Sequence, residues 1–129
     1  MAKETENLDL DVETLQKGVS TVLEGKTAAA YYVVEEANQV VGSLMLTYEW
    51  SDWRCSNIWW IQSVYVLPSA RRRGNFKRLY AHVKEEAKAA QASGLRLYAD
   101  TGNTAAHATY EKLGMTSHYK VFEDMFTSY

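Results

Sequence analysis

The sequence predicts an α/β (α+β) fold in which helices flank a mixed, mostly antiparallel sheet. Two segments, near residues 12–23 and 76–90, carry apolar residues at helical spacing. Between them lie runs rich in β-branched and aromatic residues, and the first two are joined by a short polar turn that suits an antiparallel hairpin. The chain of 129 residues is long enough to bury one core, so we expect a single domain over residues 1–129.

The first helix is expected over residues 12–23. Either Asp9 or Asp11 precedes it as the N-cap, and Gly25 follows it as a stop. Its apolar residues recur every three or four positions, which is the period of one helix face. They are Val12, Leu15, Val19, Val22 and Leu23.

Three strands are expected after this helix. Residues 31–34 and 40–48 are the first two, joined by the turn at residues 37–39. A longer loop over residues 49–57 then leads into the third strand, which is expected over residues 58–67.

Pro68 cannot donate a ladder hydrogen bond, so it marks the end of the third strand. The long helix that follows is expected to end near Gly94. Its apolar face comprises Phe76, Leu79, Tyr80, Val83, Ala87 and Ala90. A strand over residues 95–99 and a short helix over residues 103–115 come next, and the aromatic-rich residues 117–126 are expected to form the last strands.

Composition indicates an ordinary globular protein, with 47% hydrophobic and 23% charged residues. A net charge of −2 and a pI near 5.9 argue against a general nucleic-acid binder, so we expect no nucleic-acid partner. The basic cluster at residues 71–78 is a local exception.

The single cysteine, Cys55, excludes an internal disulfide and a cysteine pair for a metal. The three histidines lie at no spacing typical of a metal site, so we expect no metal. No apolar run is long enough to cross a bilayer, and the first residues lack the apolar core of a signal peptide. We therefore expect a cytoplasmic protein with no membrane partner.

The segment VYVLPSARRRGNFKRLY, residues 64–80, is the clearest chemical signal in the chain. An apolar strand stops at a proline and is followed by three arginines, a glycine and an amphipathic helix. About four N–H groups at a helix N-terminus have no intrahelical partner, so a basic loop at that point suits a pyrophosphate. The spacing matches neither a Walker loop nor a dinucleotide-binding fingerprint.

Two motifs resemble those of the GNAT acetyltransferase superfamily. Residues 71–76, Arg-Arg-Arg-Gly-Asn-Phe, resemble its Gln/Arg-x-x-Gly-x-Gly/Ala loop, although Phe76 stands where a small residue is usual. Residues 103–115 resemble its second signature, Asn-x-x-Ala-x-x-x-Tyr-x-x-x-Gly-Phe/Met. The resemblance covers about residues 8–126 and implies acetyl-CoA as cosubstrate.

The resemblance assigns the coenzyme site to two segments. Backbone groups of Val64 and Val66 would bind the pantetheine arm, while their side chains could equally serve only the core. Asn103 would either cap its helix or bind the pantetheine amide. The loop residues would meet the pyrophosphate, mainly through backbone N–H groups: Arg71, Arg72, Arg73, Gly74, Asn75, Phe76 and Lys77.

The resemblance also suggests the catalytic residues. Tyr110 would donate a proton to the leaving thiolate, since a phenol with a pKa of about 10 is protonated at neutral pH. Its alternative role is core packing in a helical stripe. Glu49 is the preferred base, because it and Asp52 lie beside Trp50 and Trp53 and could attract a cationic amine; the alternative is that both are ordinary loop charges.

Compared with the family, the chain is expected to lack the usual first strand, because few residues precede the first helix. The neighbouring hairpin would then have an open edge, which invites pairing with a second copy. We therefore expect a homodimer.

Two functions remain in competition at this point. The preferred one is an acetyl-CoA-dependent N-acetyltransferase acting on a small amine or an exposed amino group. The alternative is a non-catalytic CoA-binding or regulatory module, favoured by the short N-terminus, by Phe76 and by the lack of an unambiguous base.

Overall fold

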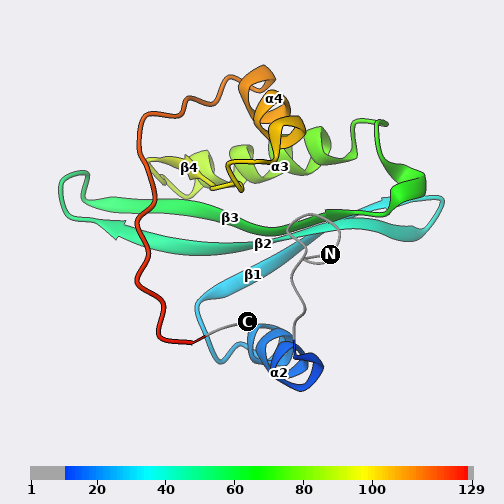
Figure 1. Cartoon of the computed structure of the whole chain (residues 1–129), viewed down its shortest axis with the longest axis horizontal. Helices are drawn as coiled ribbons and strands as arrows, with labels where there is room; N and C mark the ends of the chain where they lie inside the picture. Colours follow the sequence, from blue (N-terminus) through cyan, green and yellow to red (C-terminus); the bar gives the residue numbers. More distant parts are fainter. Residues whose placement is uncertain (1–10, 128–129) are drawn as a thin grey trace. The chain divides into compact units, whose positions relative to one another are not determined.

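The computed structural model describes residues 11–127 (Figure 1). Its helices are α2 (Val12–Leu23), α3 (Asn75–Ala89), α4 (Thr104–Lys112) and a 3-10 turn, η1 (Pro68–Ala70). Its strands are β1 (Ala29–Glu36), β2 (Gln39–Ser51), β3 (Ser56–Val66) and β4 (Gly94–Arg96). Residues 16–97 form one compact unit, which contains the sheet, and residues 98–127 with residues 11–15 form a second, which contains α4.

The sheet has the order β1-β2-β3-β4. The pairs β1–β2 and β2–β3 are antiparallel, and β3–β4 is parallel, with α3 as the crossover between the last two strands. The predicted mixed, mostly antiparallel sheet is confirmed. Within residues 11–127, no strand pairs with the outer edge of β1, and the homodimer expected from an open edge stays a prediction.

The first helix begins and ends as expected. Asp11 is the N-cap, because its carboxylate accepts the Thr14 backbone N–H at 3.0 Å. Gly25 follows the helix at φ 71°, a conformation that favours glycine. Asp9, the other predicted cap, lies outside the described residues.

The turn between β1 and β2 consists of Ala37 and Asn38, at φ 50° and 64°. Two consecutive residues with positive φ make the type of two-residue turn whose twist matches a hairpin. The turn places Glu36, the last residue of β1, directly opposite Gln39.

The loop expected over residues 49–57 is shorter than predicted. β2 continues to Ser51 and β3 begins at Ser56, because Glu49 pairs with Ile58 and Trp50 with Asn57. These residues extend the ladder and leave only residues 52–55 as a turn. The predicted loop is wrong in extent because pairing with β3 holds these polar and aromatic residues in strand conformation.

A β-bulge interrupts the pairing of β2 with β3. Ser43 pairs with Tyr65 and Met45 with Gln62, so two residues of β3, Ser63 and Val64, oppose the single Leu44. Ser63 takes φ 51°. A bulge bends its strand and leaves an extra residue outside the ladder.

The core lies between α3 and one face of the sheet. Leu44 and Leu46, two residues apart and therefore on the same face of β2, are fully buried, as is Val83 of α3. Leu79 and Ala87, each four residues from Val83, complete the buried stripe of the helix. Full burial of one such aliphatic side chain stabilises the fold by about 1.5–3 kcal/mol.

A polar contact also joins α3 to the sheet. The Tyr32 hydroxyl of β1 donates to the carboxylate of Glu86, and His82 Nε2 lies 3.2 Å from Glu86 Oε1. Burial raises the pKa of Tyr32 to about 12, and the hydrogen bond to Glu86 adds to that rise.

The C-terminal strand predictions are only partly right. β4 ends at Arg96, although a strand was expected over residues 95–99. The strands expected over residues 117–126 are absent from the described structure, where that segment has no regular secondary structure. Phe122 and Phe126 are more than 90% exposed. The segment therefore does not bury these aromatic side chains, and its backbone pairs with no described strand.

None of the helices within residues 11–127 is long and apolar enough to cross a membrane.

We expect Gly42→Ala to destabilise the protein by about 1–3 kcal/mol, because a Cβ at this position would lie 2.9 Å from Val34 Cγ1 and 3.1 Å from the Tyr65 carbonyl oxygen. Urea denaturation measures the change. Gly18→Ala is the matched control: it lies inside α2 with nothing within 4 Å, and should stabilise by about 0.5–1 kcal/mol. Equal effects of the two substitutions would contradict the close packing at Gly42.

The Tyr32 contact should weaken at alkaline pH. Its pKa is about 12 in the fold and about 10 in an unfolded chain. The unfolded chain therefore loses the proton first, and this contribution to stability is present below about pH 10 and lost as pH rises toward about 12. We expect the urea midpoint of Tyr32→Phe to fall less than that of the parent between about pH 9 and about pH 11. Equal falls would argue against the contact.

Candidate functional site

The loop between β3 and α3 is built around a tight turn and a glycine. Pro68 opens η1, and the Ala70 N–H donates to the Leu67 carbonyl at 2.9 Å. Gly74 precedes α3 at φ 79°, which suits a residue without a side chain, and it provides no side-chain cap. The first helical hydrogen bond runs from the Arg78 N–H to the Gly74 carbonyl at 3.0 Å.

The N-terminus of α3 therefore presents backbone donors. The N–H groups of Asn75, Phe76 and Lys77 precede the first intrahelical hydrogen bond, and the helix dipole adds partial positive charge at this end. An anion placed here would accept hydrogen bonds that the helix itself cannot make.

Asn75 fixes this loop from within. Its side chain is buried, with 2% exposure. Its Nδ2 donates to the Ala70 carbonyl at 2.9 Å and to Glu36 Oε1 at 3.2 Å, and its Oδ1 accepts from Arg78 Nη1 at 3.0 Å. Both halves of the carboxamide are thus bonded, which joins η1, α3 and the end of β1 in one network.

The cations of the loop divide into two groups. Three are bonded to the protein: Arg71 Nε donates to the Val66 carbonyl at 2.9 Å, Arg73 Nη1 lies 3.3 Å from Glu36 Oε2, and Arg78 is bound to Asn75 as described above. The side chains of Arg72 and Lys77 make no hydrogen bond or ion pair with the part of the chain that the structure describes.

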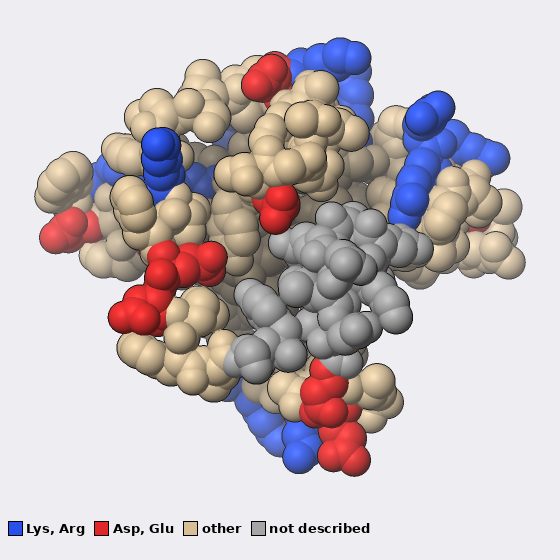
Figure 2. Space-filling model, viewed as in Figure 1, with Lys and Arg blue, Asp and Glu red and all other residues tan. Residues whose placement is uncertain are grey.

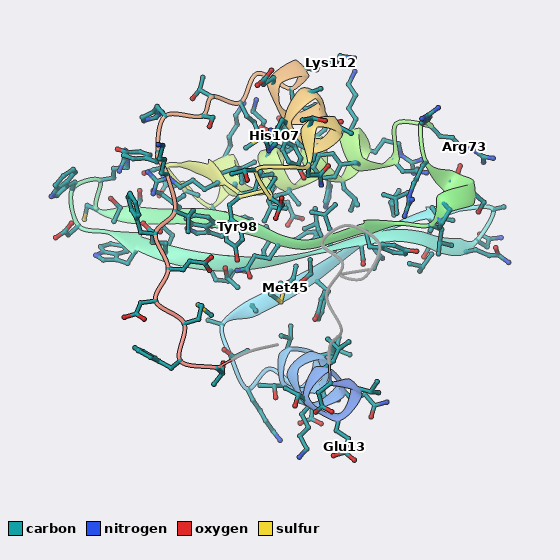
Figure 3. All side chains as sticks on the ribbon, viewed as in Figure 1. Glu13, Met45, Arg73, Tyr98, His107 and Lys112 are labelled. Atoms are coloured by element: carbon teal, nitrogen blue, oxygen red, sulfur yellow. The ribbon has the colours of Figure 1, made fainter. Side chains whose placement is uncertain are left out.

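These cations gather on one surface. Figure 2 shows Lys and Arg side chains clustered at the end of the sheet where the loop lies, and Figure 3 marks Arg73 on that loop. Arg72, exposed and at φ 63°, lies in the same turn. The surface combines unpaired positive charge with the backbone donors of α3.

Beside the loop, one edge of β3 is paired with another strand over only part of its length. β4 pairs with residues 58–60 of β3, and within the described residues no strand covers that edge from residue 61 onward. The Leu67 N–H donates to Val41 of β2 at 2.8 Å. Because successive residues of a strand direct their backbone groups to opposite edges, those of Val66 and Val64 face the uncovered edge.

Phe76 departs from the small residue usual at its position. Its half-buried ring lies 6.2 Å, centre to centre, from that of Tyr80, one turn later in α3. The ring therefore packs along the helix.

In the second unit, α4 carries the other motif. Asn103 caps this helix, since its Oδ1 accepts the Ala106 N–H at 3.2 Å. The helix stops before Gly114, which takes φ 90°. Burial raises the pKa of the Tyr110 hydroxyl above its usual value, so the phenol stays protonated at neutral pH. The alternative of Asn103 binding pantetheine stays a prediction.

Glu49 lies in strand β2 and is not a loop residue as predicted. Its carboxylate accepts from Trp60 Nε1 at 2.8 Å and from Arg96 Nη1 at 3.3 Å. It is seven residues from Gly42, the partner of Val66, which is about 24 Å along the strand. Asp52, in the turn, is exposed.

Glu36, Arg78 and the Ser63 bulge were not among the predicted site residues. Glu36 lies 37 residues before Arg73 in the sequence, so no local pattern could indicate their contact. Arg78 lies at the end of the basic cluster, about one turn into α3 and beyond the residues that match the loop motif. The bulge had no glycine to mark it.

The predicted loop residues and Val64 and Val66 thus lie together in the first unit, whereas Asn103 and Tyr110 lie in the second. Among the described residues, no group of three or more His, Cys, Asp or Glu side chains could hold a metal ion.

Comparison with known proteins places the chain in a family. Residues 3–115 match the family described as "Acetyltransferase (GNAT) family". The chain is 41% identical to a possible acetyltransferase from Clostridium difficile 630, over 98% of this chain and 84% of that one, with a TM-score of 0.87. No curated protein matches.

Two further solved structures share the fold at lower identity. The aminoglycoside antibiotic 6'-N-acetyltransferase AAC(6')-IG from Acinetobacter haemolyticus is 21% identical, over 94% of this chain and 86% of that one, with a TM-score of 0.75. AAC(6')-Iy, solved with the bisubstrate analogue CoA-S-monomethyl-acetylneamine, is 18% identical, over 98% and 87%, with a TM-score of 0.75. With its sheet, its basic loop and the match over residues 3–115, this chain belongs to the GNAT family of acetyltransferases.

Proposed function

We propose that the protein is an N-acetyltransferase that uses acetyl-CoA and transfers the acetyl group to a primary amine. The observation that supports this best is the loop from Arg71 to Lys77. It offers backbone donors, a buried support in Asn75 and two cations that pair with none of residues 11–127, all at one helix N-terminus. These features suit the pyrophosphate of the coenzyme.

The uncovered edge of β3 would bind the pantetheine arm. An extended chain with amide groups can hydrogen-bond to a strand edge in the manner of an added strand. Val64 and Val66 direct their backbone groups to that edge, which is continuous with the phosphate-binding loop. The residues of the first unit therefore suit both the charged end and the amide-containing arm of acetyl-CoA.

Tyr110 is the proposed acid. Acetyl transfer forms a C–N bond, breaks the C–S bond and leaves a thiolate that needs a proton, while the amine loses one. A phenol whose pKa is raised by burial carries its proton at neutral pH, so the proton is present for donation to the sulfur as the C–S bond breaks. Its position on α4, within the second signature, supports this role.

Glu49 is the proposed base, with a different setting from the one expected. Trp60 and Arg96 hold its carboxylate in place on the sheet, where it is partly exposed. A fixed anion would attract an acceptor ammonium and accept its proton directly or through water. The acceptor in this proposal is a primary amine.

A non-catalytic CoA-binding module is the second candidate. The observation that favours it is that both oxygens of Glu49 already accept hydrogen bonds, from Trp60 and Arg96, so the only acidic candidate on the sheet is committed to the protein. This function predicts coenzyme binding without acetyl transfer to any amine.

Removing charge at Arg72 or Lys77 should weaken acetyl-CoA binding. Each charge-assisted hydrogen bond contributes about 1.5–3 kcal/mol when well formed, and these side chains are exposed, so we expect a five- to tenfold rise in Kd for Arg72→Gln and for Lys77→Gln. Isothermal titration calorimetry measures it. Lys88→Gln, an equal charge change at the other end of α3, is the control and should leave Kd unchanged.

Saturable binding at one site per chain would support the coenzyme site. If the parent protein does not bind acetyl-CoA at millimolar concentration, the proposed function is wrong.

Tyr110→Phe should lower kcat by about a hundredfold, the size of a general-acid contribution, with the Kd for acetyl-CoA unchanged. The assay follows free thiol release with a panel of primary amines. Tyr119→Phe, in the same unit but on an exposed side chain, is the control and should retain full activity. Parental turnover in Tyr110→Phe would rule out the acid role, and binding without turnover of the parent on every amine would favour the non-catalytic module.

A further inference from the structure

Glu36 is the only acidic side chain that the described structure places in contact with the basic loop. It ends β1, beside the Ala37–Asn38 turn, and its side chain is 26% exposed. One oxygen accepts from Asn75 Nδ2 at 3.2 Å, and the other lies 3.3 Å from Arg73 Nη1. An anion at an anion-binding loop requires a physical reason.

The two contacts of Glu36 differ in kind. The Asn75 carboxamide is buried and is held at the same time by Ala70 and Arg78, so this contact cannot change without leaving a buried amide unsatisfied. The Arg73 side chain is 60% exposed and its distances to Glu36, 3.3 and 3.4 Å, are long for an ion pair. Exposed pairs of this kind contribute little to stability and exchange readily.

From this difference we propose that Glu36 is the resident counterion of Arg73, and that Arg73 leaves it for a coenzyme phosphate when the coenzyme binds. Glu36 is thus a positioning residue. It holds the Arg73 guanidinium at the loop before binding, and its competing charge limits the affinity of the site. The inference rests on the proposed function, because it takes the phosphates of the coenzyme as the incoming anion.

After Arg73 moves to a phosphate, Glu36 would keep its hydrogen bond from Asn75. The hydrogen bond from Asn75 is the largest cause of the lowered pKa of Glu36, ahead of its contacts with Arg73, while burial acts in the opposite direction. The carboxylate therefore stays ionised after Arg73 departs, with Asn75 as its donor and the charge of Arg78 nearby. A guanidinium binds phosphate through a fork of two donors, which compensates Arg73 for the pair that it loses.

Glu36→Gln tests the exchange, because glutamine can still accept from Asn75 but carries no charge. We expect it to tighten binding of both acetyl-CoA and inorganic pyrophosphate three- to fivefold in low salt, with a smaller gain in high salt. The gain should vanish in an Arg73→Gln background. Glu35→Gln removes the same charge one residue earlier, where only the backbone carbonyl contacts the loop, and should produce a clearly smaller gain.

Weaker binding by Glu36→Gln, a gain that persists without Arg73, or an equal gain in Glu35→Gln would each overturn the exchange. Thermal unfolding checks that the glutamine variant keeps the fold, and Glu36→Asp, which retains the charge, should bind as the parent does. If pyrophosphate shows the expected pattern but acetyl-CoA does not bind, the exchange stands and the proposed function fails. If neither anion binds to the parent protein, both are wrong.

Discussion

The buried carboxamide of Asn75 is the contact on which the candidate site depends. It satisfies a carbonyl of the 3-10 turn, a carboxylate at the end of β1 and a guanidinium of α3 at the same time. A residue with 2% exposure and two polar ends can be this far buried only when both ends are bonded. The loop, the helix and the first hairpin therefore keep one relative arrangement, and the donors of α3 are fixed before any ligand arrives.

The second constraint is the partial pairing of β3. β2 pairs along nearly its whole length, with the bulge at Ser63 and Val64 as the exception, whereas β4 is only three residues long. One edge of β3 is therefore covered except at the bulge, whereas β4 covers the other edge only at residues 58–60. The basic loop and the uncovered strand edge are neighbours because the same strand leads directly into the loop.

Much of this arrangement could be predicted from local patterns in the sequence. The apolar period of α3, the proline after β3 and the glycine before the helix are short-range signals, and each is found where it was expected. The extent of β2 was missed because Glu49 and Trp50 depend on partners in β3 for their strand conformation. The strands expected over residues 117–126 are wrong for the converse reason, since β-prone residues form a strand only when their backbone pairs with a neighbouring strand, and these residues pair with none in the described structure.

In the candidate site, too, some features follow from neighbouring residues in the sequence and others depend on distant residues. The order of the cations along the loop is visible in the sequence, but the pairing of Arg73 depends on Glu36, a residue far away in the chain. Glu36 reaches Arg73 across the sheet, and Asn38 permits this by allowing a two-residue turn with positive φ. Local patterns could therefore identify the loop, although not its internal contacts.

The hydrogen bond from Arg71 to the Val66 carbonyl limits which backbone group of Val66 can bind a chain lying along β3. A carbonyl oxygen already bound to a guanidinium is a poorer acceptor for another donor, while the N–H of the same residue stays uncovered by any described strand. At Val66, the strand edge next to the loop therefore offers a hydrogen-bond donor, the N–H, more readily than an acceptor. An extended chain therefore gains most at this position if it presents a carbonyl oxygen to the Val66 N–H.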